Sequence, residues 1–229
     1  MKTIGIIGGM SAESTVLYYQ IINRETNARL GGNHSADIVM HSVDFEKIVR
    51  LQKAGDWAAA GAVLAESARK LEGMGADVLV LATNTMHKIA DVIEQAVRIP
   101  LLHVVDATAA AVKAKGLSRV GLLGTHFTMS DGFYSERMAK QGVEIRVPSE
   151  NEQAEIHRII FEELCLNKIQ AGSKAYYQQV VRRLQEQGAE GVILGCTEIG
   201  LLLKENDCPL PLFDSAEIHA LAAVDFALS

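Results

Sequence analysis

The segment Gly5-Ile6-Ile7-Gly8-Gly9 is matched later in the chain by Gly121-Leu122-Leu123-Gly124-Thr125. Both are short apolar runs that end in glycine, a pattern typical of a buried strand that turns into a helix. Two further pairs follow in the same order, 75–83 with 188–196 and 100–106 with 209–214. Any two strand–helix units look somewhat alike, but the shared order and slowly drifting offsets predict a duplication. We expect two half-domains, 1–107 with 214–229 and 108–213.

Apolar runs alternate with longer helical patterns along the whole chain, which indicates strand–helix–strand units and a parallel sheet. The predicted strands are 3–7, 37–41, 78–82, 101–105, 119–123, 144–147, 191–194 and 210–213. The predicted helices are 14–29, 57–74, 85–96, 107–114, 131–141, 151–165, 173–187, 197–204 and 215–227. The fold class is therefore α/β, with two pseudo-symmetric, doubly wound, parallel-sheet half-domains. Ligands bind at the carboxyl ends of such strands, so we expect the active site in a cleft between the halves.

The amino-acid composition argues against several classes of function. The chain has 229 residues, 48% of them hydrophobic and 22% charged, with a net charge of −6, which argues against a nucleic-acid surface. No apolar run reaches the roughly 18 residues of a membrane span. The three cysteines Cys165, Cys196 and Cys208 cannot all pair and lack metal-ligand spacing. We expect a cytoplasmic protein that binds a small molecule and no metal.

The two matched strand ends carry the candidate chemistry, because Thr83 and Cys196 occupy the same place in the repeat. Racemisation removes a proton from one face of a carbon and returns one to the other face, so it benefits from two opposed acid/base groups. A predicted helix starts next to Cys196, and a helix N-terminus can lower the pKa of a thiol. The sequence therefore predicts a thiolate base at Cys196.

Three segments resemble the aspartate/glutamate racemase family. They are 8–15, with Gly8-Gly9-Met10-Ser11; 83–87, Thr-Asn-Thr-Met-His; and 195–199, Gly-Cys-Thr-Glu-Ile. The resemblance covers essentially the whole chain. It implies a duplicated α/β fold, homodimers, and catalysis without metal, pyridoxal phosphate or another cofactor. It also implies two cysteines as the paired acid/base groups, but the first family cysteine aligns with Thr83 here.

The resemblance assigns roles residue by residue. Cys196 and Thr83 are the expected proton-transferring pair, acting on an amino-acid substrate of the aspartate or glutamate type. In the family the second-half cysteine faces the α-hydrogen of the L-enantiomer, so we expect reaction to start more readily from L-substrates. The expected substrate-binding residues are Met10, Gln52, Asn84, Thr85, Thr125 and Thr197.

Several alternatives stay open at this point. Related proteins decarboxylate arylmalonates or isomerise maleate, and a chain that lost one cysteine could be a weakened enzyme that only binds small carboxylates. Cys196 could be a structural thiol, and Thr83 a helix cap. His87 and Glu198 lie close to the candidate pair, but a helix-surface histidine and a carboxylate complementing a helix dipole are simpler interpretations.

Overall fold

The computed structural model describes residues 1–229 and contains two four-stranded sheets in which every strand pair is parallel. This confirms the predicted α/β class with two parallel-sheet halves. The strands of the first sheet are β1 (Ile4–Gly8), β2 (Ile38–Ser42), β3 (Val78–Leu81) and β4 (Leu101–Leu102). Those of the second are β5 (Arg119–Gly124), β6 (Glu144–Arg146), β7 (Gly191–Gly195) and β8 (Leu212–Asp214).

The two sheets share one topology. The first runs β2-β1-β3-β4 and the second β6-β5-β7-β8, so each strand has a counterpart four strands later. The chain divides into two compact units, Met1–Val104 with His219–Ser229, and Val105–Ile218. We call them unit 1 and unit 2. The repeat predicts half-domain boundaries after residues 107 and 213, and these boundaries remain a prediction.

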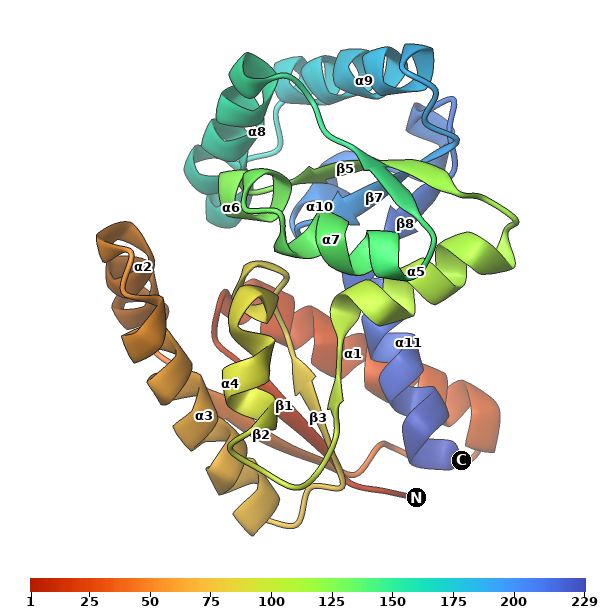
Figure 1. Ribbon diagram of the computed structural model, residues 1–229. Helices are drawn as coiled ribbons and strands as arrows, with labels where there is room; N and C mark the ends of the chain where they lie inside the picture. The colour runs from red at the N-terminus through yellow and green to blue at the C-terminus, as the bar shows by residue number, and fades with distance from the viewer. The chain divides into compact units, whose positions relative to one another are not determined.

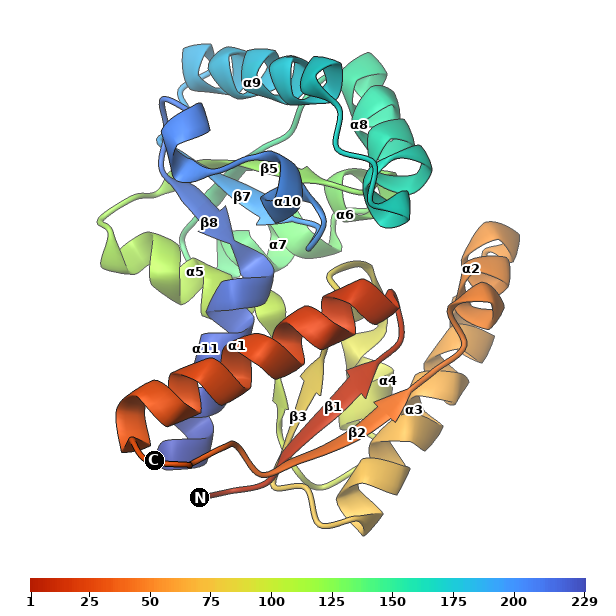
Figure 2. The same cartoon turned by 180° about the vertical axis from the view of Figure 1, so that it is seen from behind.

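Helices flank both sheets (Figures 1 and 2). In unit 1, α3 and α4 lie on one side of the sheet and α1 lies on the other, with most of α11. The helices before β5 are α1 (Ala12–Leu30), α2 (Phe45–Ala54), α3 (Trp57–Gly73), the 3-10 helix η1 (Thr85–Ile89), α4 (Ala90–Glu94) and α5 (Val104–Ala114). Those that follow are α6 (His126–Ser130), α7 (Phe133–Lys140), α8 (Glu150–Glu162), η2 (Leu164–Leu166), α9 (Ala171–Glu186), α10 (Ile199–Leu202), η3 (Glu205–Asp207) and α11 (Ser215–Leu228).

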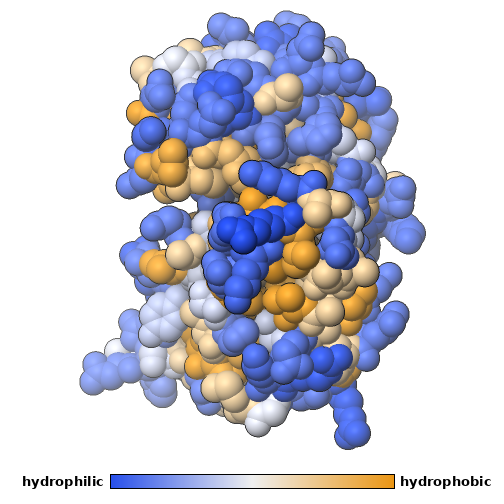
Figure 3. Space-filling view, turned by 90° about the vertical axis from the view of Figure 1, so that its left-hand side faces the viewer, coloured by the Kyte–Doolittle hydropathy of each residue, from blue (hydrophilic) through white to orange (hydrophobic).

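The central strands form the core of each unit. Every residue of β1, β3 and β7 is buried, as expected for parallel strands covered on both faces. Burying one large aliphatic side chain contributes about 1.5–3 kcal/mol. Hydrophilic residues cover much of the face seen in Figure 3, with apolar patches between them. None of the helices is long and apolar enough to cross a membrane.

Some predicted elements are wrong in extent. The strand predicted at 101–105 ends at Leu102, and α5 already begins at Val104, whose N–H donates to the ring of His87 instead of to a neighbouring strand. The helix predicted at 85–96 is a 3-10 turn followed by the short α4. The helix predicted at 197–204 is reduced to the four residues of α10.

Two α-helices were not predicted, α2 and α6. The local signals for α2 are complete: the Asp44 side chain accepts from the N–H of Glu46, and Gly55 ends the helix in the left-handed conformation. α6 is a single short helix capped by Thr125 and separated from α7 by Gly132 at φ 78°. The missed α2 carries Gln52, one of the expected substrate-binding residues.

Candidate active site

All candidate residues except Gln52, which lies on α2, follow the carboxyl ends of the central strands in each unit. In unit 1, Met10 follows β1 and Thr83 follows β3. In unit 2, Thr125 follows β5 and Cys196 follows β7. Because β3 and β7 hold the same position in their sheets, Thr83 and Cys196 stand at topologically equivalent strand ends.

Cys196 is partly buried, and its thiol lies against the carboxylate of Glu198. The Sγ–H group donates to Glu198 Oε2 over 3.0 Å, and the Thr197 hydroxyl donates to the same oxygen over 2.7 Å. Glu198 itself is only 6% exposed. The carboxylate is thus placed to accept the proton of either hydrogen-bond donor.

The acidity of Cys196 is shifted opposite to the sequence-based expectation. Burial raises the pKa of the Cys196 thiol well above its ordinary value, and the negative charge of Glu198 raises it further. The predicted helix that should favour a thiolate is only the short α10, which begins three residues later at Ile199. A full carboxylate charge in contact outweighs the partial charge of such a helix end. The expectation that a helix N-terminus lowers the pKa of Cys196 is therefore wrong.

Two further titratable side chains lie near the thiol, Cys165 on η2 and Tyr177 on α9. Burial raises the pKa of Cys165 to about 12, with a smaller contribution from the charge of Glu198. Burial also raises the pKa of Tyr177 well above its ordinary value, and a charge on Cys196 acts in the same direction. The surroundings of Cys196 therefore favour its neutral thiol form in the free protein.

Thr83 lies in a different chemical environment. Its carbonyl oxygen lies 2.7 Å from His87 Nδ1, and the Val104 N–H donates to His87 Nε2 over 3.3 Å. This pattern requires the tautomer with its proton on Nδ1. Burial, together with His103 and His219, keeps the pKa of His87 well below its ordinary value. His87 is thus neutral, and both its nitrogens are engaged with backbone, so it is not placed to act as a base for the Thr83 hydroxyl.

The other candidates of unit 1 lie around this strand end. Asn84 and Thr85 are buried at the start of η1. The Gln52 amide on α2 donates to the sulfur of Met86 over 3.0 Å. Met10 belongs to the hydrophobic cluster of the unit, which also includes Met86. Unit 1 therefore brings Gln52 and Met10 toward the segment that follows β3.

In unit 2, Thr125 and Cys196 follow paired strand residues, since Gly124 and Gly195 are register partners. Thr125 caps α6: its Oγ1 accepts from the N–H of Thr128, and the two hydroxyls lie 3.1 Å apart. A Cβ at Gly195 would stand 3.0 Å from a backbone oxygen of the neighbouring strand β5. The glycine pair therefore lets the two strand ends approach closely.

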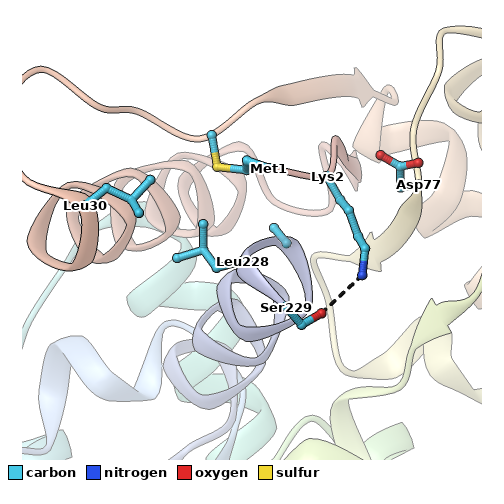
Figure 4. A pocket seen from close by; sticks show the side chains of 7 residues that line it. Met1, Lys2, Leu30, Asp77, Leu228 and Ser229 are labelled. Atoms are coloured by element: carbon cyan, nitrogen blue, oxygen red, sulfur yellow. Dashed lines mark hydrogen bonds between the residues drawn. The ribbon is translucent and has the colours of Figure 1, made fainter.

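A separate pocket of about 420 Å³ lies at the opposite end of the first sheet (Figure 4). It is lined by both chain ends, where Lys2 Nζ donates to Ser229 Oγ over 3.1 Å. Asp77 accepts from the N–H of Thr3. None of the candidate residues lines this pocket, so we do not assign the reaction to it. No three His, Cys, Asp or Glu side chains are grouped to hold a metal ion.

The fold and the two matched strand ends define the chain as a duplicated α/β protein with a hydroxyl and a thiol at equivalent positions. Residues 7–223 match the family described as Asp/Glu/Hydantoin racemase, and the chain belongs to this family. The family resemblance seen in the sequence is thereby confirmed. Relatives of this family are named racemases, so the chain is an enzyme of the isomerase class.

Several individual relatives are named as racemases or racemase homologues. The broad specificity amino-acid racemase RacX of Bacillus subtilis is 27% identical over 164 residues, which cover 72% of this chain and 70% of the relative. A Yersinia pestis structure, named as a candidate Asp/Glu racemase, is 49% identical with a TM-score of 0.95 and full coverage of both chains. PH1733 of Pyrococcus horikoshii, an aspartate racemase homologue, is 35% identical with a TM-score of 0.87, again with full coverage of both. Arylmalonate decarboxylase shares the fold at 17% identity and a TM-score of 0.58, over 98% of this chain and 92% of its own.

Proposed function

We propose that the chain is a cofactor-independent racemase of aspartate- and glutamate-type amino acids, with Cys196 and Thr83 as its two proton-transferring groups. The observation that carries the proposal is the equivalent placement of these residues after β7 and β3, in two units of identical strand order. The relatives named glutamate racemase and aspartate racemase homologue support this substrate class.

The chemistry follows from these two groups. A Cys196 thiolate removes the α-hydrogen of the L-amino acid, which leaves a carbanion whose charge spreads onto the α-carboxylate. Polar groups aimed at that carboxylate stabilise the developing charge. We assign this part to Asn84, Thr85 and the backbone N–H of Thr197, whose hydroxyl donates to Glu198, with Thr125 as a further contact. The Thr83 hydroxyl then delivers a proton to the opposite face and yields the D-amino acid.

The two proton-transferring groups, the Cys196 thiol and the Thr83 hydroxyl, differ in acid strength. A hydroxyl is a far weaker acid than a thiol, and a base works best when its pKa lies near the operating pH. The nearest histidine, His87, is already held by backbone groups on both nitrogens. We therefore propose that proton removal starts from the L-enantiomer at Cys196, and that Thr83 limits inversion.

Solvent-deuterium exchange at the α-carbon tests the proposal. Chelator-treated protein free of pyridoxal phosphate is incubated in D₂O with each enantiomer of aspartate and glutamate. NMR then follows exchange, and chiral chromatography follows inversion. We expect rapid exchange from the L-forms and slower inversion. A decarboxylase would instead release carbon dioxide from an arylmalonate, and a binding protein would give no exchange. Either result, or a requirement for added metal or pyridoxal phosphate, would contradict the proposal.

We also propose that the enzyme is a homodimer. Val16 and Tyr19 on α1 are each about half exposed, at 51% and 50%, and their three-residue spacing puts them on one face of the helix. Exposed apolar side chains grouped in this way are typical of interaction surfaces. Sedimentation equilibrium should give twice the chain mass of 24.8 kDa, shifted toward the monomer by Tyr19→Lys. A monomer at micromolar concentration would contradict this.

A further inference from the structure

We propose that Glu198 is the proton store of Cys196: its carboxylate takes the thiol proton when Cys196 becomes the base, and later releases it. The inference rests on the proposed racemase function. It deepens that function by naming a residue that contacts the reacting sulfur. The sequence offers only the spacing as a signal, since Glu198 stands two positions after Cys196.

The hydrogen bond gives the proton a defined path. Cys196 Sγ lies 3.0 Å from Glu198 Oε2, within the range for a thiol donor. A second donor, the Thr197 hydroxyl, fixes the same oxygen at 2.7 Å. Because Glu198 is 6% exposed, the carboxylate is held within the protein and faces little competition from bulk water. The Cys196 thiol and the Thr197 hydroxyl both help to hold this carboxylate in place.

No other titratable group near the thiol can store its proton at neutral pH. The neighbouring Cys165 and Tyr177 are themselves weak acids, because burial raises the pKa of both. A neutral thiol or phenol has little tendency to accept a proton. Among the titratable groups that face Cys196, from the turn after β7, from η2 and from α9, the Glu198 carboxylate is the base.

Every proton that moves during one turnover has a defined donor and acceptor. In the resting enzyme Cys196 is a thiol and Glu198 a carboxylate. Transfer along the hydrogen bond gives a thiolate and a carboxylic acid, with no change in total charge. The thiolate then takes the α-hydrogen of the L-substrate and is again a thiol. Thr83 protonates the other face, and its alkoxide regains a proton from water while Glu198 releases one to water.

With this arrangement, a buried Cys196 can still act as a base. A thiol with a raised pKa would be a poor base if its proton had to leave for bulk solvent. With a carboxylate in contact, the charge only moves from Oε2 to Sγ inside the site. The positive α-ammonium group of a bound amino acid would favour a negative charge nearby, so the thiolate is formed when substrate is present.

Glu198→Gln separates this role from a structural one, because glutamine keeps the size and the acceptor oxygen but cannot hold the proton. We expect α-deuterium exchange from L-aspartate or L-glutamate to fall about 100-fold or more. Loss of the negative charge should at the same time lower the midpoint pH for alkylation of Cys196 by iodoacetamide, by about one to three units. Mass spectrometry of the Cys196 peptide reports the alkylation, and circular dichroism confirms the fold.

Glu205→Gln is the matched control, since it removes one exposed carboxylate from the same unit. It should change neither readout. Exchange in Glu198→Gln within a few-fold of wild type, or an unshifted alkylation midpoint, would overturn the inference. If Glu198→Gln does not fold, the wild-type profile decides: a midpoint at or below the ordinary thiol value of about 8.5 overturns it. Absence of exchange in the wild type would instead count against the racemase function itself.

Discussion

At the scale of single residues, the environment of Cys196 decides its chemistry. Its surroundings raise the pKa of the thiol, and the thiol is hydrogen bonded to a carboxylate, so in the proposed mechanism catalysis depends on the sulfur and on the group that receives its proton. This differs from a cysteine activated by a helix N-terminus, where the thiolate is already present in the free protein.

Cys196→Ser tests the need for sulfur. A serine hydroxyl can occupy the same place, but its alkoxide is much harder to form than a thiolate. We expect α-exchange from L-substrates to fall at least about 1,000-fold, as for loss of an acid/base group. Cys208→Ser, at a partly buried thiol elsewhere in unit 2, is the control and should retain exchange. Wild-type exchange in Cys196→Ser, measured by NMR in D₂O, would exclude the thiol as base.

Thr83→Cys tests the asymmetry between the two strand ends. With an equilibrium constant of one, kcat/KM for inversion must be equal in both directions, so a weak second base slows inversion both ways. The L-preference then shows only as exchange with retention of configuration. We expect Thr83→Cys to raise inversion from both enantiomers, and exchange from the D-forms, by about tenfold or more. Equal wild-type exchange from both enantiomers, unchanged in the variant, would refute the asymmetry.

At the scale of elements, the turn from β1 into α1 holds the segment that carries Met10. Gly9 adopts a φ of 91°, and its N–H donates to the Thr15 hydroxyl over 2.7 Å. A Cβ at Gly9 would lie 2.2 Å from the backbone oxygen of Val43, a distance that no small adjustment can relieve. The glycine is therefore required by both its conformation and its surroundings.

Gly9→Ala should lower the free energy of unfolding by about 3 kcal/mol or more, because backbone strain and overpacking add. Gly55→Ala is the matched control: its φ is 70° but its Cβ would meet open space. That substitution should cost only about 1–2 kcal/mol. Urea unfolding followed by the fluorescence of Trp57 measures both, since Trp57 lies in the same unit. Equal losses for the two variants would show that the close contact at Gly9 is unimportant.

At the scale of the whole molecule, the C-terminal segment of the chain, from His219 onward, belongs to unit 1. The buried His219 side chain connects this segment to the rest of the unit. His219 on α11 lies 2.9 Å from the Tyr18 hydroxyl on α1 and 2.8 Å from the carbonyl of Leu102, the last residue of β4. The carbonyl can only accept, so Nε2 carries the proton and Nδ1 accepts from the tyrosine. This one side chain ties together the first helix, the last helix and the edge of the sheet.

Burial lowers the pKa of His219 from 6.5 to about 4, which makes stability depend on pH. Above pH 6.5 the ring is neutral in both folded and unfolded states, and it contributes no pH dependence. As the pH falls from 6.5 to about 4, only the unfolded state takes up the proton, so stability is lost. The shift corresponds to roughly 3 kcal/mol. His87 acts in the same direction.

Urea unfolding at pH 7 and pH 5, followed by Trp57 fluorescence, measures this loss. Wild type should be less stable at pH 5, and His219→Gln should show a smaller drop between the two pH values because the titrating ring is gone. His34→Gln, at an exposed histidine of the same unit, should keep the wild-type drop. An identical drop in His219→Gln and wild type would show that His219 does not titrate as described.

The sequence by itself determined the duplicated α/β plan and the place of Cys196 and Thr83 in it. Both follow from local patterns, since buried parallel strands are continuous apolar runs and the same runs recur in the same order. The shortened α10 and the contact between Cys196 and Glu198 were decided by tertiary structure. Helix ends, side-chain directions and buried charges depend on what packs around them, and two residues of spacing do not reveal whether a carboxylate turns toward a thiol or toward water.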